Sequence, residues 1–260
     1  MQQTLSGQSV LNRPARTRRP LTIRIGSKLR PHLDQMMTPF SLIGTDPVFD
    51  STAFGWAEML RAHWQAIRQE ALVVARNPDA VPALNTISPD HQTIAADQGW
   101  RSFFLVGYGA RIQRNLDQCP VTASVLAHVP GLNSGFFSIL KPGTHIPRHV
   151  GVTKGLITCH LGLVVPEGPL RMMVDDRELR WREGETLFFD DTYPHEVWND
   201  TDGTRIVLLV QFERPLRQPG RAIAKAFLGG IRRSAFVRDA VSNLDKWEEN
   251  FRKIEEIASH

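Results

Sequence analysis

Histidine is the residue type in this chain with the widest choice of chemistry. Nine histidines are present, and four of them lie in its strand-like centre: His145, His149, His160 and His195. A neutral imidazole can bind a transition metal, but a lone histidine on a strand is more often a hydrogen-bonded structural residue. The arrangement of these four residues must therefore decide whether a metal site is present.

The segment around His160 alternates as a strand with two different faces. Successive side chains of a strand point to opposite sides. One face of residues 156–165 is apolar and contains Ile157, Cys159, Leu161, Leu163 and Val165. The other face contains Thr158, His160 and Gly162. We expect this more polar face to line a cavity.

The last predicted strand directs an arginine toward the same interior. Over residues 205–212 the packed face contains Ile206, Leu208, Val210 and Phe212, which leaves Arg205, Val207, Leu209 and Gln211 opposite. Arg205 is expected at the mouth of a barrel, pointing inward, where a buried charge without a partner is strongly unfavourable. Its partner is then either a dicarboxylate ligand or one of the acids Asp190, Asp191 and Glu213.

Two histidines and a carboxylate on one face are the common ligands of non-haem iron in oxygenases. Their usual sequence pattern is histidine, any residue, then acid. Here the corresponding run is His149-Val150-Gly151, so the acid is missing. The spacing alone weakens the case for His149 as a ligand, although water can fill the vacant position.

Several motifs in a fixed order point to a known family. They are SILKPGTH at 138–145, HVG at 149–151, HLGL at 160–163, FDDTYPHEVW at 189–198, and Arg205. Together they closely resemble the aspartyl/asparaginyl β-hydroxylase family of 2-oxoglutarate oxygenases. The resemblance is strong over residues 135–216 and loose in the flanks.

The resemblance implies an iron(II) site and a cosubstrate site. His149 and His195 match the two iron ligands, and Gly151 falls where the animal peptide hydroxylases of the family also have glycine. The family uses O2 and 2-oxoglutarate, releases succinate and carbon dioxide, and hydroxylates an unactivated C–H. The chain is thus expected to be a dioxygenase, and its missing acid to be a feature of that branch.

Other family positions match residues around this site. Ser138 and Arg205 match residues that bind the distal carboxylate of 2-oxoglutarate, and His160 matches a histidine that contacts the cosubstrate near the metal. Asp190 and Asp191 match acids that precede the second ligand. Their implied role is to orient His195 or a metal-bound water.

The substrate is less well defined. The family implies the β-carbon of an Asp- or Asn-like residue, in a peptide, an amino acid or a small molecule. It usually has an arginine where this chain has Thr158, on a strand that offers Leu156 and Thr158 instead. Lys154 or Arg148 are the candidates to replace that arginine and receive an acidic substrate.

Three alternatives stay open. A lipid-modifying branch of the family makes an acyl chain a possible substrate, although that branch generally carries the acid missing at Gly151. The same glycine would leave a coordination position for chloride, as in radical halogenases. A cupin-like protein that binds ligands without catalysis is the third alternative.

The expected fold is mainly β with flanking helices: a double-stranded β-helix, that is, a cupin-like jelly roll, in one domain. Strands are expected at 136–140, 156–165, 170–174, 186–189 and 205–212, without intervening helices. We divide the chain into a basic disordered arm (1–25), a helical N-terminal flank (26–100), the jelly-roll core (101–216) and C-terminal helices (217–260). Helices are expected at 25–37, from the capping residues 50–52 through 74, at 222–231 and at 241–257.

Charge is concentrated at the N-terminal end. The first 33 residues contain seven basic side chains and no acid, whereas the rest contains 24 basic and 27 acidic residues. The net charge of +4 is therefore a property of the arm, and we expect no nucleic-acid partner. The arm is either solvated or in contact with an anionic partner such as a membrane surface. Only two cysteines are present, which is typical of a reducing compartment, and we expect a cytoplasmic protein.

Overall fold

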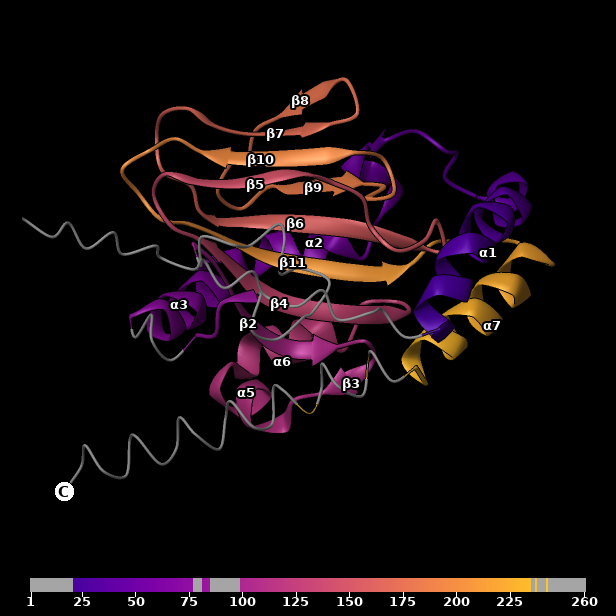
Figure 1. Ribbon diagram of the computed structural model, residues 1–260. Helices are drawn as coiled ribbons and strands as arrows, with labels where there is room; N and C mark the ends of the chain where they lie inside the picture. The colour runs from indigo at the N-terminus through magenta and orange to yellow at the C-terminus, as the bar shows by residue number, and fades with distance from the viewer. Residues whose placement is uncertain (1–20, 77–80, 85–98, 235–236, 238–241, 243–260) are drawn as a thin grey trace, which may run out of the picture.

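Two antiparallel β-sheets form the centre of the molecule (Figure 1). The computed structural model describes residues 21–76, 81–84, 99–234, 237 and 242. The larger sheet has seven strands, in the order β1 (Val48–Phe49), β9 (Thr186–Phe189), β6 (Leu156–Val164), β11 (Arg205–Glu213), β4 (Leu132–Leu140), β2 (Trp100–Gly107) and β3 (Ala110–Arg111). The smaller sheet has four, in the order β5 (Thr144–His149), β10 (His195–Asn199), β7 (Leu170–Val174) and β8 (Arg177–Leu179).

From β4 to β11 the chain crosses repeatedly between the two sheets, so most neighbours in this part of each sheet are far apart in sequence; the sequential pair β7 and β8 is the exception. β11 lies between β4 and β6, and β10 lies between β5 and β7, all antiparallel. This connectivity between two packed sheets is that of a jelly roll. The expected mainly β fold with flanking helices is therefore confirmed. The strands expected at 170–174 and 186–189 coincide with β7 and β9, and the other three fall on β4, β6 and β11 with shifted ends.

The pleat of the large sheet sorts its side chains into two cores. The apolar faces expected for the strands at 156–165 and 205–212 are buried in a core that also contains helical side chains. They contribute Ile157, Cys159, Leu161 and Leu163 from β6 and Ile206, Leu208, Val210 and Phe212 from β11. The helices on this face are α2 (Ala57–Ala62), α3 (Trp64–Ala75), α5 (Gln113–Gln118) and α6 (Pro120–Leu126). Residues of the opposite parity, including Phe136, Leu140 and Val207, pack in a second core with side chains of the small sheet. The polar residues that share this inward parity therefore lie between the sheets.

Two expectations about the helices were wrong. α5 and α6 lie between β3 and β4, inside the span that we expected to contain strands only. The single helix expected through residue 74 is interrupted at His63, which separates α2 from α3. Its expected capping residue, Asp50, instead accepts a hydrogen bond from the Thr52 N–H (2.8 Å) and caps a short 3-10 helix, η2 (Ser51–Ala53).

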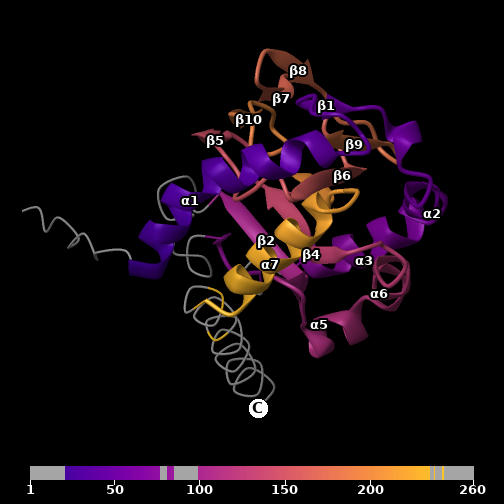
Figure 2. The same ribbon diagram turned by 90° about the vertical axis from the view of Figure 1, so that its right-hand side faces the viewer.

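Two further helices cover one end of the sandwich (Figure 2). They are α1 (Leu21–Met37), followed by the 3-10 turn η1 (Thr38–Phe40), and α7 (Gly220–Arg232). Met37, Leu216 and Ala224 form a small core where α1 and α7 meet. Within the described residues no helix has the length and apolar character needed to cross a bilayer. Most of the basic arm and of the helix expected at 241–257 lies outside the described residues.

Candidate active site

Two strands of the small sheet bring His149 and His195 together. His149 is the last residue of β5, His195 is the first residue of β10, and the two are direct cross-strand partners. Their ring centroids lie 4.0 Å apart, with the ring planes tilted by 53°. Two imidazoles at this separation are suitably placed to share one metal ion.

The two rings are held in the same way. Nδ1 of His149 lies 2.9 Å from the carbonyl oxygen of Pro147, and Nδ1 of His195 lies 3.0 Å from that of Tyr193. A carbonyl can only accept, so each Nδ1 carries a proton and each Nε2 keeps its lone pair. A backbone acceptor of this kind fixes the tautomer and orientation of metal-binding histidines.

Burial keeps both rings neutral. It lowers the pKa of His149 to about 4, with a further contribution from His195 nearby. Burial also lowers the pKa of His195, although hydrogen bonds from its ring to backbone carbonyls oppose that shift. Neutral imidazole is the form that binds a metal, so the pair is ready to do so at neutral pH.

The missing acid at position 151 has a structural counterpart in Asp191. A Cβ added to Gly151 would overlap the carboxylate of Asp191, and the Gly151 N–H donates to the Asp191 carbonyl oxygen over 2.6 Å. Asp191 thus occupies the space that a side chain at 151 would fill. Among the described residues, no group of three or more histidine, cysteine or acidic side chains is arranged to hold a metal.

Asp191 is buried with one oxygen bound and one free. Its Oδ2 accepts from Thr158 Oγ1 (2.9 Å) and from Gln211 Nε2 (3.0 Å). Within the described residues Oδ1 has no hydrogen-bond partner, although it is buried. Burial and the neighbouring Asp190 raise the pKa of Asp191 to about 6. The free oxygen on the Gly151 side can accept from a water bound to a metal held by the histidines.

Arg205 lies inside the sandwich, as expected, and has no carboxylate partner among the described residues. Only 1% of it is exposed, and burial lowers its pKa to about 9. Its Nη1 donates weakly to Ser138 Oγ (3.3 Å) and to the Ser138 carbonyl (3.4 Å), and its Nε has no partner in the described part of the chain. The alternative of a salt bridge to an acid is therefore wrong, because each of the three acids has other partners: Asp190, Asp191 and Glu213.

Ser138 and Trp100 complete this part of the site. The Trp100 indole Nε1 donates to Ser138 Oγ over 2.9 Å, so this oxygen accepts from both Trp100 and Arg205. The Ser138 hydroxyl proton then stays available to another acceptor. Arg205 and Ser138 therefore present donors suited to a carboxylate, and Trp100 orients the Ser138 hydroxyl.

A row of rings connects Arg205 to the histidine pair. The Arg205 guanidinium lies 5.1 Å from the Trp181 ring centroid, and Trp181 Nε1 donates to His160 Nδ1 over 3.2 Å. His160 therefore carries its proton on Nε2, which is buried and has no partner within the described residues. The His160 and Phe189 centroids are 5.1 Å apart, and those of Phe189 and His195 are 5.6 Å apart.

These residues fit an iron(II) and 2-oxoglutarate site on chemical grounds. Among the described residues, the buried polar atoms between the sheets that have no partner are two donors, Arg205 Nε and His160 Nε2, one acceptor, Asp191 Oδ1, and the hydroxyl of Ser102, which lies across from Ser138. Buried polar atoms are rarely left without a partner. An anionic cosubstrate would satisfy both donors, and a metal-bound water would satisfy the acceptor.

Asp190 is bound away from the histidines. Its Oδ2 pairs with Lys154 Nζ (3.0 Å) and with Arg214, while its Oδ1 accepts from the Thr192 N–H (3.0 Å). Of the two acids assigned an orienting role, Asp191 is thus the one with an oxygen free toward the metal site. Asp190 instead holds the loop that leads to His195.

The residues considered for an acidic substrate are engaged elsewhere or face outward. Lys154 pairs with Asp190, and Thr158 donates its hydroxyl proton to Asp191. Arg148 is exposed on β5, and Leu156 is buried with 3% exposure. None of the four presents a free cation between the sheets.

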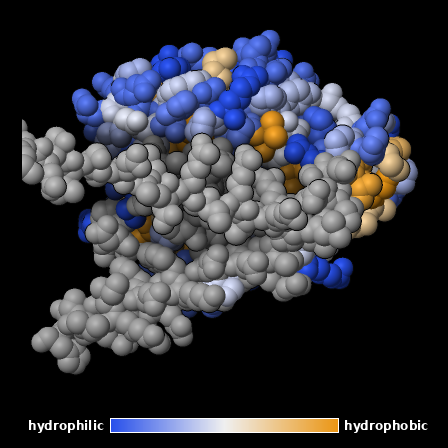
Figure 3. All heavy atoms as spheres, in the orientation of Figure 1, coloured by the Kyte–Doolittle hydropathy of each residue, from blue (hydrophilic) through white to orange (hydrophobic). Residues whose placement is uncertain are grey.

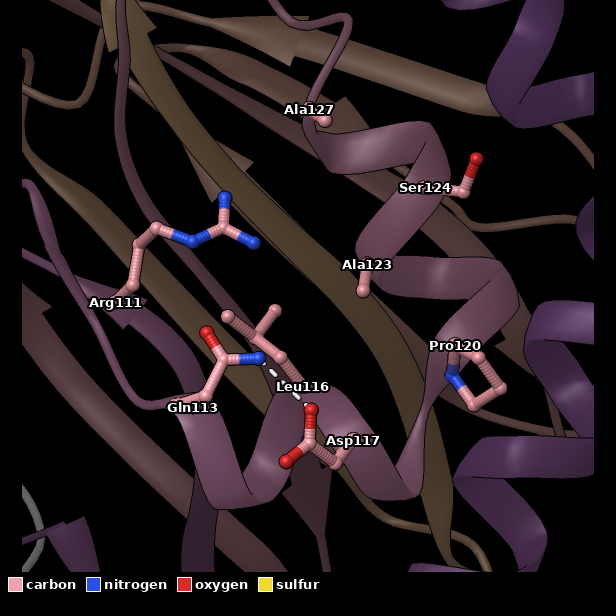
Figure 4. A pocket seen from close by; sticks show the side chains of 8 residues that line it. All are labelled: Arg111, Gln113, Leu116, Asp117, Pro120, Ala123, Ser124 and Ala127. Atoms are coloured by element: carbon pink, nitrogen blue, oxygen red, sulfur yellow. Dashed lines mark hydrogen bonds between the residues drawn. The ribbon is translucent and has the colours of Figure 1, made fainter.

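A separate hollow lies over α5 and α6, on the far side of the large sheet (Figure 4). It is lined by Arg111, Gln113, Leu116, Asp117, Pro120, Ala123, Ser124 and Ala127. Gln113 and Asp117 form a hydrogen bond of 2.8 Å with each other there. This hollow contains none of the residues assigned to the metal or cosubstrate.

Three residues of the site were not singled out from the sequence. Gln211 had a usable signal, because the alternation of the last strand places it inward with Arg205. Trp100 and Trp181 had none, because their roles depend on which strands become neighbours.

Comparisons with known proteins agree with this geometry. The family model for aspartyl/asparaginyl β-hydroxylases matches residues 61–215. An ornithine lipid ester-linked acyl 2-hydroxylase from Rhizobium tropici is 38% identical over 214 residues, which cover 82% of this chain and 76% of that protein. The human aspartyl/asparaginyl β-hydroxylase is 30% identical over 173 residues, which cover 64% of this chain and 22% of the human protein.

Among solved structures, a Pseudomonas putida prolyl-4-hydroxylase aligns over 58% of this chain and 88% of its own, at 20% identity and a TM-score of 0.38. The jelly-roll assignment rests on the strand order of the chain itself. The two curated relatives are hydroxylases by name, and their similarity extends well beyond the metal-site motifs. The chain therefore belongs to the aspartyl/asparaginyl β-hydroxylase family.

Proposed function

We propose that this protein is an iron(II)- and 2-oxoglutarate-dependent dioxygenase that hydroxylates an acyl chain of a polar lipid. The cofactor assignment rests on two neutral imidazoles and a buried arginine that belong to the same site. The histidine rings lie 4.0 Å apart with each Nδ1 bound to a backbone carbonyl, and Arg205 is buried with no carboxylate partner among the described residues. A metal and a diacid together satisfy what this site leaves unpaired.

The side chains have distinct tasks in this proposal. His149 and His195 would hold the metal, and Asp191 Oδ1 would accept a hydrogen bond from water beside them. Arg205 and Ser138 would bind the distal carboxylate of 2-oxoglutarate, and His160 Nε2 would donate a hydrogen bond to another oxygen of the cosubstrate. When bound, iron and 2-oxoglutarate supply the oxidising chemistry that breaks an unactivated C–H bond. The protein orients the reactants and excludes water between its sheets.

A lipid substrate is better supported than an Asp or Asn side chain, which the sequence motifs alone placed first. Thr158 replaces the arginine expected for an acidic substrate, and its hydroxyl is already bound to Asp191. Lys154 is bound to Asp190. The relative named for lipid acyl 2-hydroxylation also matches this chain over 76% of its own length, against 22% for the human protein.

Halogenation is disfavoured by Asp191. A chloride ligand would need space and positive potential near Gly151. The Asp191 carboxylate occupies that space and is buried with a free oxygen. The same donors and acceptor argue against a non-catalytic cupin-like binding protein, which would not require all of them.

The test is turnover of purified protein with iron(II), ascorbate, 2-oxoglutarate and O2. Detergent-dispersed ornithine lipid and a peptide containing Asp and Asn serve as separate substrates, each with and without chloride. Succinate and the mass of the organic product are measured, and His195→Ala is the inactive control. We expect succinate and one added oxygen atom on an acyl chain of the lipid.

Other outcomes separate the alternatives. Hydroxylation of the peptide alone would reassign the substrate to Asp or Asn. A chlorinated product would identify a halogenase. Absence of both succinate and iron binding would leave a binding protein without catalysis.

A further inference from the structure

The end of the molecule beside the two histidines contains most of its exposed apolar side chains. Of the six large apolar side chains that are exposed among the described residues, five lie here: Leu29, Met36, Leu42, Val150 and Val152. The sixth, Val73, lies on α3, behind the large sheet. Isolated exposed apolar residues are ordinary, whereas a group at one end indicates an interaction surface.

Hydrogen bonds join the segments that bear these five residues. Asp34 on α1 accepts from Thr153 Oγ1 and from the Lys154 N–H, both at 2.8 Å, and so binds α1 to the loop after His149. Arg214 donates to the Lys154 carbonyl (2.6 Å) and to the Gly44 carbonyl (2.9 Å). That arginine connects the same loop to the segment around Leu42. The segments that carry the five exposed side chains are therefore neighbours at this end of the molecule.

The exposed residues of α1 share one side of the helix. Leu29 and Met36 are seven residues apart, which returns to the same side after two turns. They are 50% and 55% exposed, whereas Asp34 and Met37 are buried against the rest of the fold. The helix thus uses one side for packing and leaves an apolar stripe on another.

Exposed positive charge lies beside this apolar group. α7 lies beside α1 at this end (Figure 2) and has no acidic residue between Gly220 and Arg232. Its Arg221 and Lys225 are exposed, and so is Arg217 just before it. Figure 3 shows apolar atoms at the right-hand edge of the molecule, where Figure 1 places these two helices.

The same end of the molecule contains the histidine pair. Val150 directly follows His149, and Val152 is two residues further along. β5 ends and β10 begins on the side of the sandwich where α1 and α7 lie (Figure 1). A molecule bound at this surface would lie close to the histidine pair.

We propose that this docking face, formed by Leu29, Met36, Leu42, Val150 and Val152 with the cations of α7, binds the surface of an anionic membrane. Apolar side chains beside cations are the combination that inserts into an interface of acyl chains and anionic headgroups. The inference rests on the proposed function, because an acyl chain of a bilayer lipid has to reach the histidines without crossing water. The docking face places the histidine end of the molecule against the bilayer.

Flotation of the full chain with vesicles tests this directly. The vesicles contain phosphatidylcholine alone or mixed with phosphatidylglycerol, at low and high salt. The variants are Leu29→Ser/Met36→Ser and Arg221→Glu/Lys225→Glu. The matched controls are Val73→Ser, on α3, and Arg180→Glu, beside the small sheet. Hydroxylation of detergent-dispersed ornithine lipid is measured for every variant, and equal activity shows that each is folded.

We expect binding to the mixed vesicles that weakens at high salt, with both controls unchanged. The apolar variant should bind at least about tenfold more weakly, and the charge variant about fivefold more weakly for each cation lost. Equal vesicle binding by the wild type and both variants would overturn the docking face. Self-association without vesicle binding would overturn it too, by assigning the surface to a second copy of the chain. Failure of the wild type to hydroxylate dispersed lipid, with vesicle binding as expected, would instead overturn the proposed substrate.

Discussion

The carboxylate of Asp191 lies where a side chain on residue 151 would have to lie. A Cβ at Gly151 would overlap that carboxylate, and the two residues are also joined by a backbone hydrogen bond. The acid missing from the His149-Val150-Gly151 run is therefore matched by an acid from another loop. Its free oxygen sits near the histidine pair without belonging to a group of three metal-binding side chains.

Restoring an acid at position 151 should damage the site rather than complete it. Gly151→Asp would crowd two buried carboxylates into one space, and overpacking of this kind costs about 1–3 kcal/mol of stability. We expect a lower melting temperature and weaker iron(II) binding. The double variant Gly151→Asp/Asp191→Gly should recover stability. Gly55→Ala is the control, because nothing lies within 4 Å of a Cβ there. Tighter iron binding by the single variant would contradict the overlap.

Arg205→Met should separate cosubstrate binding from folding. A charge-assisted hydrogen bond contributes about 1.5–3 kcal/mol, so the KM for 2-oxoglutarate should rise about 10- to 150-fold. Ser138→Ala should raise it less, by about 2- to 10-fold. Stability without cosubstrate should not fall in Arg205→Met, because the variant removes an unpaired buried cation. The exposed Arg180→Met serves as control, and an unchanged KM in Arg205→Met would contradict the assignment.

Gln211→Leu should weaken metal binding without contacting the metal. Gln211 donates to Asp191 and accepts from Asn133 Nδ2 over 2.9 Å, so it fixes the carboxylate from behind. Loss of such an orienting group typically lowers metal affinity about 10- to 100-fold. Iron(II) or cobalt(II) titration measures the effect. Gln113→Leu is the matched control, because Gln113 is exposed on α5 and donates there to Asp117, far from the histidine pair. Equal affinities in the two variants would show that Gln211 has no such role.

Acid should destabilise the metal-free protein through its buried histidines. The pKa of His149 falls from 6.5 in the unfolded chain to about 4 in the fold. The unfolded chain therefore takes up protons first, and the free energy of unfolding decreases as pH falls from 6.5 toward 4. The raised pKa of Asp191 acts in the opposite sense, since its stabilising contribution is complete below 3.8 and is lost as pH rises through about 6.

Asp191→Asn removes that opposing contribution. Urea unfolding of the metal-free variant should therefore show a steeper loss of stability than the wild type between pH 6.5 and pH 4.5. Parallel pH dependences in the two proteins would mean that Asp191 does not titrate in this range.

The strand alternation and the family motifs can be recognised in the sequence because both depend on residues that are close together along the chain. The inward direction of Thr158, His160 and Arg205 followed from parity alone. β5 and β10 were not predicted, because Pro147 and charged side chains interrupt their apolar pattern. The Asp191 carboxylate beside Gly151 is a contact between two loops, and no spacing along the chain indicates it.

Anaerobic titration with iron(II) and then with 2-oxoglutarate tests the proposed metal and cosubstrate site most directly. Binding is monitored by visible charge-transfer absorption and by calorimetry. We expect one iron per wild-type chain, with the absorption band appearing only when 2-oxoglutarate joins the iron. His149→Ala and His195→Ala should each lose at least about 100-fold in iron affinity, while Arg205→Met should bind iron normally and need at least about tenfold more 2-oxoglutarate. Wild-type iron affinity in either histidine variant, or wild-type 2-oxoglutarate binding in Arg205→Met, would contradict the proposed site.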